Sequence, residues 1–372
     1  MISTRFVRSA AGSAGLAAAL LLATPAARAA AQEGPAQRLR LGLGLETIYH
    51  DNLLEYSDGQ LATFEAGTSP DRYSIESEDD VVLEPAVSLT YERDRGRGVG
   101  RTIRLRWSGA FHGSNATADR NAAGVLWREE FGRGRALTAS AYRLPHYYLR
   151  QLLDEDVPLA EPNRYRRASF GLTIATLGWR QRIARRTTGS VGYRYERRDY
   201  NDDFRERDSN THEAGVGVAW AARGGKFELG GEGAYRASDA KAEDGDDPAG
   251  AVPDDPDVSY HGLVLGAEAR IELARGGSGR LAADAAYEYR SRDYTSERLA
   301  DASHFGREDR THLVTAGIRW NPRGPFALKA YYQRENNHAS FASPNPPATD
   351  PASYGANRFG ASIEWGTTLW KQ

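Results

Sequence analysis

Apolar and polar residues alternate with a period of two along most of this chain. Between Leu263 and Leu273, for example, every second residue is Leu, Ala or Ile, whereas Glu268, Arg270 and Glu272 stand among the residues between them. Successive side chains of a β-strand point to opposite faces, so each such segment has one apolar face and one polar face. The pattern predicts strands over residues 38–50, 80–92, 101–112, 124–131, 135–144, 165–182, 187–200, 211–222, 226–237, 258–273, 279–292, 309–320, 325–335 and 356–370.

The connections between these segments alternate between short and long. Only a few residues, such as 132–134 and 223–225, follow the even-numbered segments, whereas long stretches such as 51–79, 145–164 and 238–257 follow the odd-numbered ones. Transmembrane β-barrels have short periplasmic turns and long external loops, and an even strand number puts both termini in the periplasm. We therefore predict an all-β fold, a transmembrane antiparallel up-and-down β-barrel of about 14 strands (range roughly 12–16) with both termini periplasmic.

Trp and Tyr residues gather at opposite ends of the predicted strands. Five Trp residues lie toward the short-connection ends of even-numbered strands, and eight Tyr residues lie toward the long-connection ends of odd-numbered strands. Trp107, in mid-strand, and Tyr91, at the short-connection end, are exceptions. Such side chains collect at membrane–water interfaces, because their rings are apolar at one end and polar at the other. Two interfaces are therefore indicated where the connection lengths place them. The residues are Trp179, Trp220, Trp320, Trp365 and Trp370, and Tyr49, Tyr142, Tyr193, Tyr195, Tyr235, Tyr287, Tyr289 and Tyr332.

The start of the chain has the organisation of a secretory signal. Arg5 and Arg8 precede an Ala- and Leu-rich run over residues 10–23, which a stretch of small residues follows. The run is shorter than the roughly 20 residues that a helix needs to cross a bilayer. We expect residues 1–30 to be a cleaved signal peptide and residues 31–372 to form a single outer-membrane barrel domain.

Composition agrees with this prediction and excludes several kinds of function. The mean hydropathy of −0.61 is polar, as expected where only alternate residues face lipid. The chain has no cysteine, so disulfides, a thiol nucleophile and a lipid-modified cysteine are excluded. Its formal net charge of −2 gives no reason to expect a nucleic-acid partner.

In these patterns the chain resembles bacterial outer-membrane β-barrel proteins of the porin-like class, over nearly all of residues 31–372. The resemblance implies a location in the outer membrane after cleavage of the signal. It implies contact with the lipid bilayer and lipopolysaccharide, and with the barrel-assembly machinery during insertion. Such barrels usually end on an aromatic residue, whereas here Lys371 and Gln372 follow Trp370. That departure leaves the end of the last strand open.

The inward positions of the predicted strands carry many charged residues. Charges in a dry core are unfavourable, so they indicate a hydrated lumen or a paired ion network. We predict a channel for passive diffusion of small polar or charged solutes. We expect a basic wall and an acidic wall to face each other across its pore. The alternative is local pairing, such as that of Arg270 with Glu268 and Glu272. The basic wall is Arg104, Arg106 and Arg128, and the acidic wall is Glu228, Glu232, Glu268, Glu272, Asp284 and Glu288.

Other functions have less support. The histidines lie near the long connections, and the pairs His50/Asp51 and His212/Glu213 could suggest acid–base chemistry. Neighbours in a strand point to opposite faces, so we expect no catalytic residues, no enzyme activity, no cofactor and no metal site. The acidic stretch 238–257 leaves divalent-ion binding open. A non-channel barrel also remains open, either an adhesin or scaffold, or an export accessory for surface lipoprotein or polysaccharide.

Overall fold

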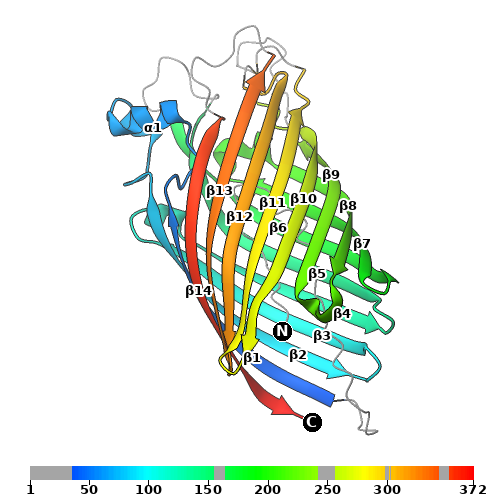
Figure 1. Ribbon diagram of the computed structural model, residues 1–372. Coiled ribbons are helices and arrows are strands. Elements are labelled where there is room, and N and C mark those ends of the chain that lie inside the picture. The colour runs from blue at the N-terminus through cyan, green and yellow to red at the C-terminus, as the bar shows by residue number, and fades with distance from the viewer. Residues whose placement is uncertain (1–35, 155–163, 242–255, 298–300, 302, 343–351) are drawn as a thin grey trace.

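One closed antiparallel barrel makes up the computed structural model of the chain (Figure 1). The structure describes residues 36–154, 164–241, 256–297, 301, 303–342 and 352–372. The expected signal peptide, residues 1–30, lies outside them. In these residues fourteen strands each pair with their neighbours in sequence, and β1 pairs with β14, which closes the ring.

The strands agree closely with the ranges expected from the period of two. Each expected segment corresponds to one strand, and most strands extend a few residues beyond the expected range. The predicted all-β barrel of fourteen strands is therefore confirmed. The strands are β1 Ala36–His50, β2 Asp80–Asp94, β3 Val99–His112, β4 Arg120–Phe131, β5 Ala136–Leu153, β6 Tyr165–Ala184, β7 Thr187–Tyr200, β8 Ser209–Ala221, β9 Phe227–Ala240, β10 Tyr260–Gly276, β11 Gly279–Tyr294, β12 Arg307–Pro322, β13 Phe326–Phe341 and β14 Tyr354–Lys371.

The outer surface of the barrel is apolar. Large hydrophobic side chains at alternate positions are exposed, among them Leu105 (53%), Val216 (63%) and Ile318 (53%). A closed barrel satisfies its backbone hydrogen bonds between strands and has no free edge, which is what a lipid environment requires. Apolar exposure on this scale is rare on soluble monomers. The architecture is therefore that of a membrane-spanning barrel.

No helix in the described part of the chain is long and apolar enough to cross a membrane.

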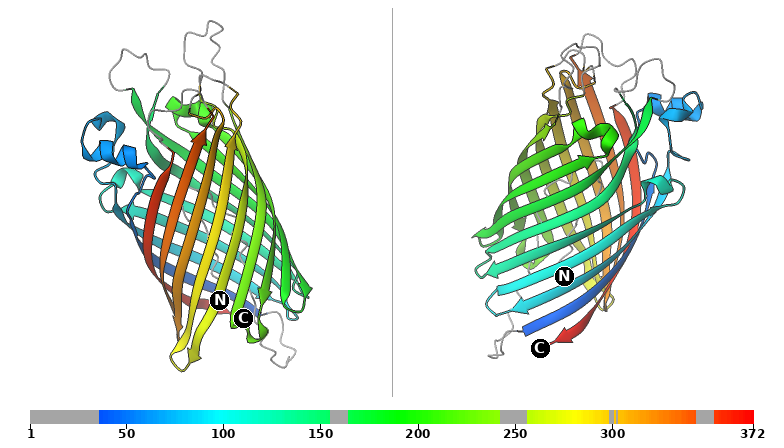
Figure 2. Two further views of the ribbon diagram at one scale, coloured as in Figure 1. Left: turned by 45° about the horizontal axis from the view of Figure 1, so that its top comes forward. Right: turned by 180° about the vertical axis from the view of Figure 1, so that it is seen from behind.

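All the short turns lie at one end of the barrel and the long connections at the other (Figure 2). The start of β1 and the end of β14 lie at the short-turn end, where the backbones of Gln37 and Gln372 exchange hydrogen bonds of 3.0 Å. This pairing carries the last strand past Trp370 to Lys371. At Gly224 in the turn η4 (Arg223–Gly225), φ is +82°, a conformation that favours glycine.

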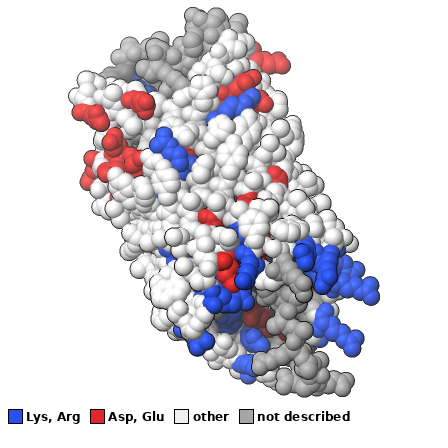
Figure 3. Space-filling model, in the orientation of Figure 1, with Lys and Arg blue, Asp and Glu red and all other residues white. Residues whose placement is uncertain are grey.

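Charge differs between the two ends of the barrel. On the face in Figure 3, Lys and Arg gather around the short-turn end, and Asp and Glu gather near α1 (Asp58–Glu65). The turns at residues 95–98 and 132–135 each contain two arginines and no acid. Charged residues thus border both ends of the apolar surface.

The long-loop end contains structure that the alternating pattern did not predict. The helix α1 begins at Ser57, whose Oγ accepts from Gln60 N while the Gln60 side chain accepts from Ser57 N. Three short 3-10 helices also lie at this end, η1 (Pro70–Arg72), η2 (Ala116–Ala118) and η3 (Asp202–Arg207).

Strand β5 also departs from the prediction, because it continues to Leu153 instead of ending at Leu144. The expected loop 145–164 is therefore shorter than predicted. The register with β6 shifts between Leu144 and Tyr147 and again between Tyr148 and Arg150. These irregularities accommodate Pro145 and interrupt the period of two that marked the strand.

Candidate functional site in the barrel lumen

Buried ion pairs fill much of the inward face in the long-loop half of the barrel. Arg194 and Arg198 both bond to Glu196, at 2.5 and 2.7 Å, and the three side chains come from β7. Glu213 of β8 and Arg236 of β9 make a second pair, with Nε 2.7 Å from Oε2. Buried charges are stable only when they are paired in this way. This half of the lumen is therefore a paired ion network.

Apolar side chains cover another part of the inward face at the same end. Leu144, Tyr147, Phe170 and Ile174 of β5 and β6 form a buried cluster. The centroid of the Phe170 ring lies 5.0 Å from the ring centroid of Tyr147 and 5.1 Å from that of Tyr200. The lumen here combines an apolar wall with charged walls.

Residues 52–57, which we call the lid segment, fold into this end of the barrel. Asn52 orders the segment: its Nδ2 donates to the carbonyl oxygen of Tyr56 (2.7 Å) and its Oδ1 accepts from the backbone N–H of Tyr56 (2.8 Å). The Asn52 Nδ2 also donates to the carbonyl of Gly355 (3.1 Å), just inside β14. The lid segment is thereby joined to the barrel wall.

Glu55 is the residue by which the lid segment reaches the charged wall. Its φ of +56° lies in the left-handed region, and only 5% of the residue is exposed. Arg358 of β14 donates to its carboxylate at 3.0 Å, and Arg358 also lies 3.6 Å from Glu335 of β13. Arg150 of β5 donates to the carbonyl oxygen of Leu54 at 2.8 Å. The lid segment is thus tied to both sides of the barrel mouth.

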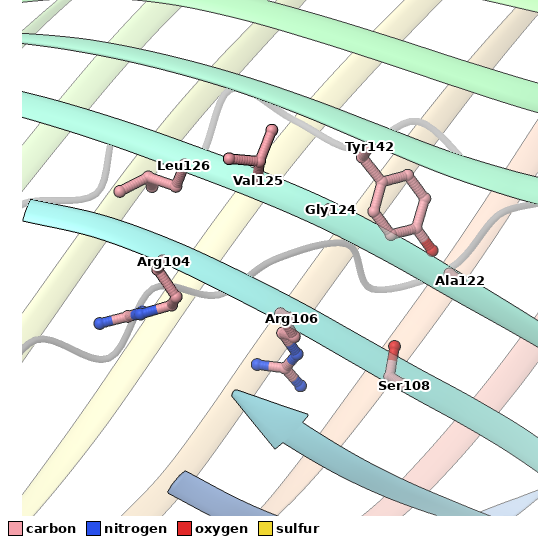
Figure 4. A pocket seen from close by; sticks show the side chains of 8 residues that line it. All are labelled: Arg104, Arg106, Ser108, Ala122, Gly124, Val125, Leu126 and Tyr142. Atoms are coloured by element: carbon pink, nitrogen blue, oxygen red, sulfur yellow. The ribbon is translucent and has the colours of Figure 1, made fainter. Parts of the chain in front are cut away.

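In the expected basic wall, Arg104 and Arg106 lie in the middle of β3, and Arg128 lies near the short turn after β4. Arg104 Nε donates to Thr90 Oγ1 of β2 at 3.2 Å, and Arg128 pairs with Glu130 at 2.6 Å. Figure 4 shows Arg104 and Arg106 extending from the same side of β3, beside a small cavity of about 20 Å³. Arg128 is therefore locally neutralised, and Arg104 and Arg106 border the cavity.

Three of the six residues of the expected acidic wall, Glu232, Glu268 and Asp284, lie against glycines on the neighbouring strand. Glu232 is paired in register with Gly266, and Glu268 with Gly230. A Cβ built on either glycine would lie 2.8 Å from the Cγ of that glutamate, so each glutamate lies against a glycine. Asp284 is paired with Gly317 in the same way. Glycines thus provide the recesses in which these acids lie along the barrel wall.

Glu228, Glu272 and Glu288 have arginines nearby, and Asp284 also lies opposite Arg270 in the register of β10 and β11. Glu272 bonds to Arg275 at 2.7 Å and pairs with Arg280, both close to the short turn after β10. Glu288 pairs with Arg290 on its own strand. Glu228 lies opposite Arg270 in the register of β9 and β10. The expected wall residues are thus on three adjacent strands and are partly neutralised where they lie.

The residues of the His212/Glu213 pair noted in the sequence lie on opposite faces of the barrel wall. His212 lies on the outer face and bonds to the Tyr193 hydroxyl at 2.6 Å, whereas Glu213 lies inside with Arg236. The Tyr287 hydroxyl makes an equivalent bond on the outer face, with its oxygen 2.9 Å from His312 Nδ1. Within the described ranges no group of three or more His, Cys, Asp or Glu could hold a metal ion. Most of the acidic stretch 238–257 lies outside those ranges.

No protein-family model and no curated protein matches this chain. Solved structures do match at low identity. An outer membrane channel, DcaP of Acinetobacter baumannii, is 12% identical over 91% of this chain and 99% of its own, with a TM-score of 0.46. A bacterial polysaccharide outer membrane secretin is 11% identical over 89% of this chain and 98% of its own, with a TM-score of 0.46. An anion-selective porin from Comamonas acidovorans is 10% identical over 89% of this chain and 99% of its own, with a TM-score of 0.38. Similarity at this level identifies neither a family nor a solute.

Proposed function

We propose that this protein is a bacterial outer-membrane channel for the passive diffusion of small polar or charged solutes. The observation that carries the proposal is the contrast between the two faces of the barrel wall. The outer face is apolar, whereas the inner face is charged in both halves, and Glu232 and Glu268 lie along the wall in glycine recesses. A lumen with this lining suits water and ions.

The proposed orientation puts the short turns in the periplasm and the long loops outside the cell. Loop asymmetry of this kind is general in outer-membrane barrels. The lid segment and Glu55 would then lie at the external mouth, where a solute enters. Lipid and lipopolysaccharide would surround the apolar outer face.

The proposed selectivity rests on strand order. Strands β3 and β10 are seven steps apart in either direction around the ring of fourteen, as are β4 and β11. Arg104 and Arg106 therefore belong to the side of the ring opposite Glu232, Glu268 and Asp284. Charged walls set ion selectivity in pores, because low-dielectric walls focus the field between them. We infer a field across the width of the pore.

Planar-bilayer recording of the purified protein tests the channel function. Stable single-channel steps that depend on salt concentration are expected. Protein that migrates as a folded barrel in unheated gel electrophoresis and yet gives no steps would contradict the proposal, because misfolding would then be excluded as the cause.

A further inference from the structure

A second cavity, of about 50 Å³, lies beneath the lid segment. Seven strands contribute to its lining, namely β1 to β5, β13 and β14, and the lid segment contributes Leu53, Leu54 and Glu55. These strands are consecutive around the ring, so the cavity lies against one half of the wall at the mouth of the barrel. We call it the lid chamber. It does not include the arginines of the basic wall.

Three polar atoms on residues that line the lid chamber have no hydrogen-bond partner among the described residues. They are His50 Nδ1, His112 Nε2 and Arg358 Nε. The side chain of His112 has no exposed surface and that of Arg358 is 8% exposed. Buried polar groups in folded proteins nearly always have a partner, so such a cluster indicates that a polar group belongs there.

Arg358 Nε requires an acceptor, and the two histidine nitrogens can donate to the same acceptor when they carry a proton. Arg358 Nε can only donate a hydrogen bond, and each imidazole nitrogen donates when it carries a proton. His112 donates its Nδ1–H to Asp119, at 3.1 Å, so its Nε2, the nitrogen left for the chamber, accepts in the neutral ring and donates only in the imidazolium form. Arg120, which also lines the chamber, adds a second guanidinium 3.7 Å from Glu84. Two arginines, two imidazoles and the carboxylates of Glu55 and Glu84 thus line one small space.

The apolar part of the lining limits the ligand further. Leu54 and Tyr147 line the chamber, and Tyr147 also belongs to the apolar cluster with Phe170 and Leu144. An oxyanion bound to the histidines would therefore lie beside a continuous apolar surface. The space of about 50 Å³ holds about four water molecules. That is room for a carboxylate group, with the remainder of the solute directed along the apolar wall.

We propose that the lid chamber binds the carboxylate of small solutes that also carry an apolar portion. The proposal rests on the channel function above and names a solute class for it. His50 Nδ1 and Arg358 Nε donate to the carboxylate oxygens, and the His112 imidazolium does so through Nε2, because charge-assisted hydrogen bonds to carboxylates are the strongest available to these donors. Tyr147 and the apolar cluster pack against the remainder of the solute.

Calorimetric titration of the purified protein in detergent measures this binding without requiring conduction. The probes are benzoate, its neutral analogue benzyl alcohol, and acetate. Benzoate is expected to bind saturably and more tightly than both. Benzyl alcohol binding as tightly as benzoate would overturn the role of the carboxylate. Acetate binding as tightly would overturn the role of the apolar wall.

Variants then locate the site. The double variant His50→Ala, His112→Ala is expected to weaken benzoate binding by about tenfold or more, as for the loss of a hydrogen bond to a charged group. His212→Ala is the matched control, since His212 lies on the outer face, and it should leave binding unchanged. Equal affinity of the double variant and the wild type would overturn the proposal, provided that the variant still migrates as a folded barrel.

The two proposals fail in different ways. Single-channel conduction without saturable benzoate binding overturns the lid chamber as a carboxylate site and leaves the channel intact. Saturable binding that the histidine variant abolishes, in a protein without conduction, overturns the channel and supports the site.

Discussion

Gly360 and Tyr331 show how single residues shape the lumen. Both lie on the inner face, on β14 and β13, and a Cβ built on Gly360 would overlap the Tyr331 ring. Tyr331 also lines the lid chamber. The missing side chain at position 360 is therefore what allows the ring to lie against the wall.

Gly360→Ala is expected to destabilise the barrel by about 1–3 kcal/mol, the usual effect of overpacking, or to push Tyr331 into the lid chamber. Gly366→Ala on the same face of β14 is the control, because its added Cβ would find only ordinary contacts, at 3.7 Å or more. Urea unfolding of both variants in lipid measures the difference. Equal stability of the two, with unchanged benzoate affinity, would contradict this account of the pair.

Parity along a strand predicted the direction of most single side chains. The period of two predicts that Glu213 points inward and His212 outward, and both side chains do so. The same rule places His50 and His112 inside at the loop ends of their strands. Their convergence on one chamber depends on ring closure and strand stagger, which a single sequence does not specify. The lid chamber was therefore missed.

Among the elements, the strands were predictable and the lid segment was not. Alternation marks most of each strand, because the lipid-facing side is largely apolar, and in β5 it marks only the part before Pro145. The lid segment depends on contacts between residues far apart, such as Glu55 with Arg358, 303 positions later. Its one local signal is Ser57 with Gln60, the capping pair that begins α1.

The lid segment should respond to pH through Glu55. Burial, followed by the charge of Glu335, raises the pKa of Glu55 to about 7, while Arg358, Tyr354 and Arg150 act in the opposite direction. Because the docked carboxyl binds its proton more tightly than an exposed one, docking is favoured at acidic pH. That stabilisation is complete below the ordinary pKa of about 4.5 and is lost as the pH rises through about 7.

The fraction of time that the channel is open is therefore expected to rise between about pH 5 and pH 8. Glu55→Gln should remove this dependence and keep the closed fraction high, because glutamine resembles the protonated acid. Glu65→Gln, at the exposed end of α1, is the control and should keep it. Single-channel records across this pH range measure the effect. A wild-type open fraction that does not change with pH would rule out Glu55 as the sensor.

For the whole molecule, the orientation in the membrane is the first matter to test. A tag inserted at Gly245, in the long connection after β9, should be reachable by antibody on intact cells. A tag at Gly224, in the short turn η4, should be reachable only after the outer membrane is permeabilised. The reverse labelling pattern would invert the proposed orientation, and the lid segment would then face the periplasm.

The central claim is a channel whose opposite walls carry opposite charge. Its most direct test is the reversal potential of single channels in a salt gradient, compared between the wild type and the double variant Arg104→Ala, Arg106→Ala. These arginines lie across the ring from Glu232, Glu268 and Asp284. Removing them should shift the reversal potential toward cation preference, with conductance kept or raised. An unchanged reversal potential in a conducting, folded variant would contradict the account.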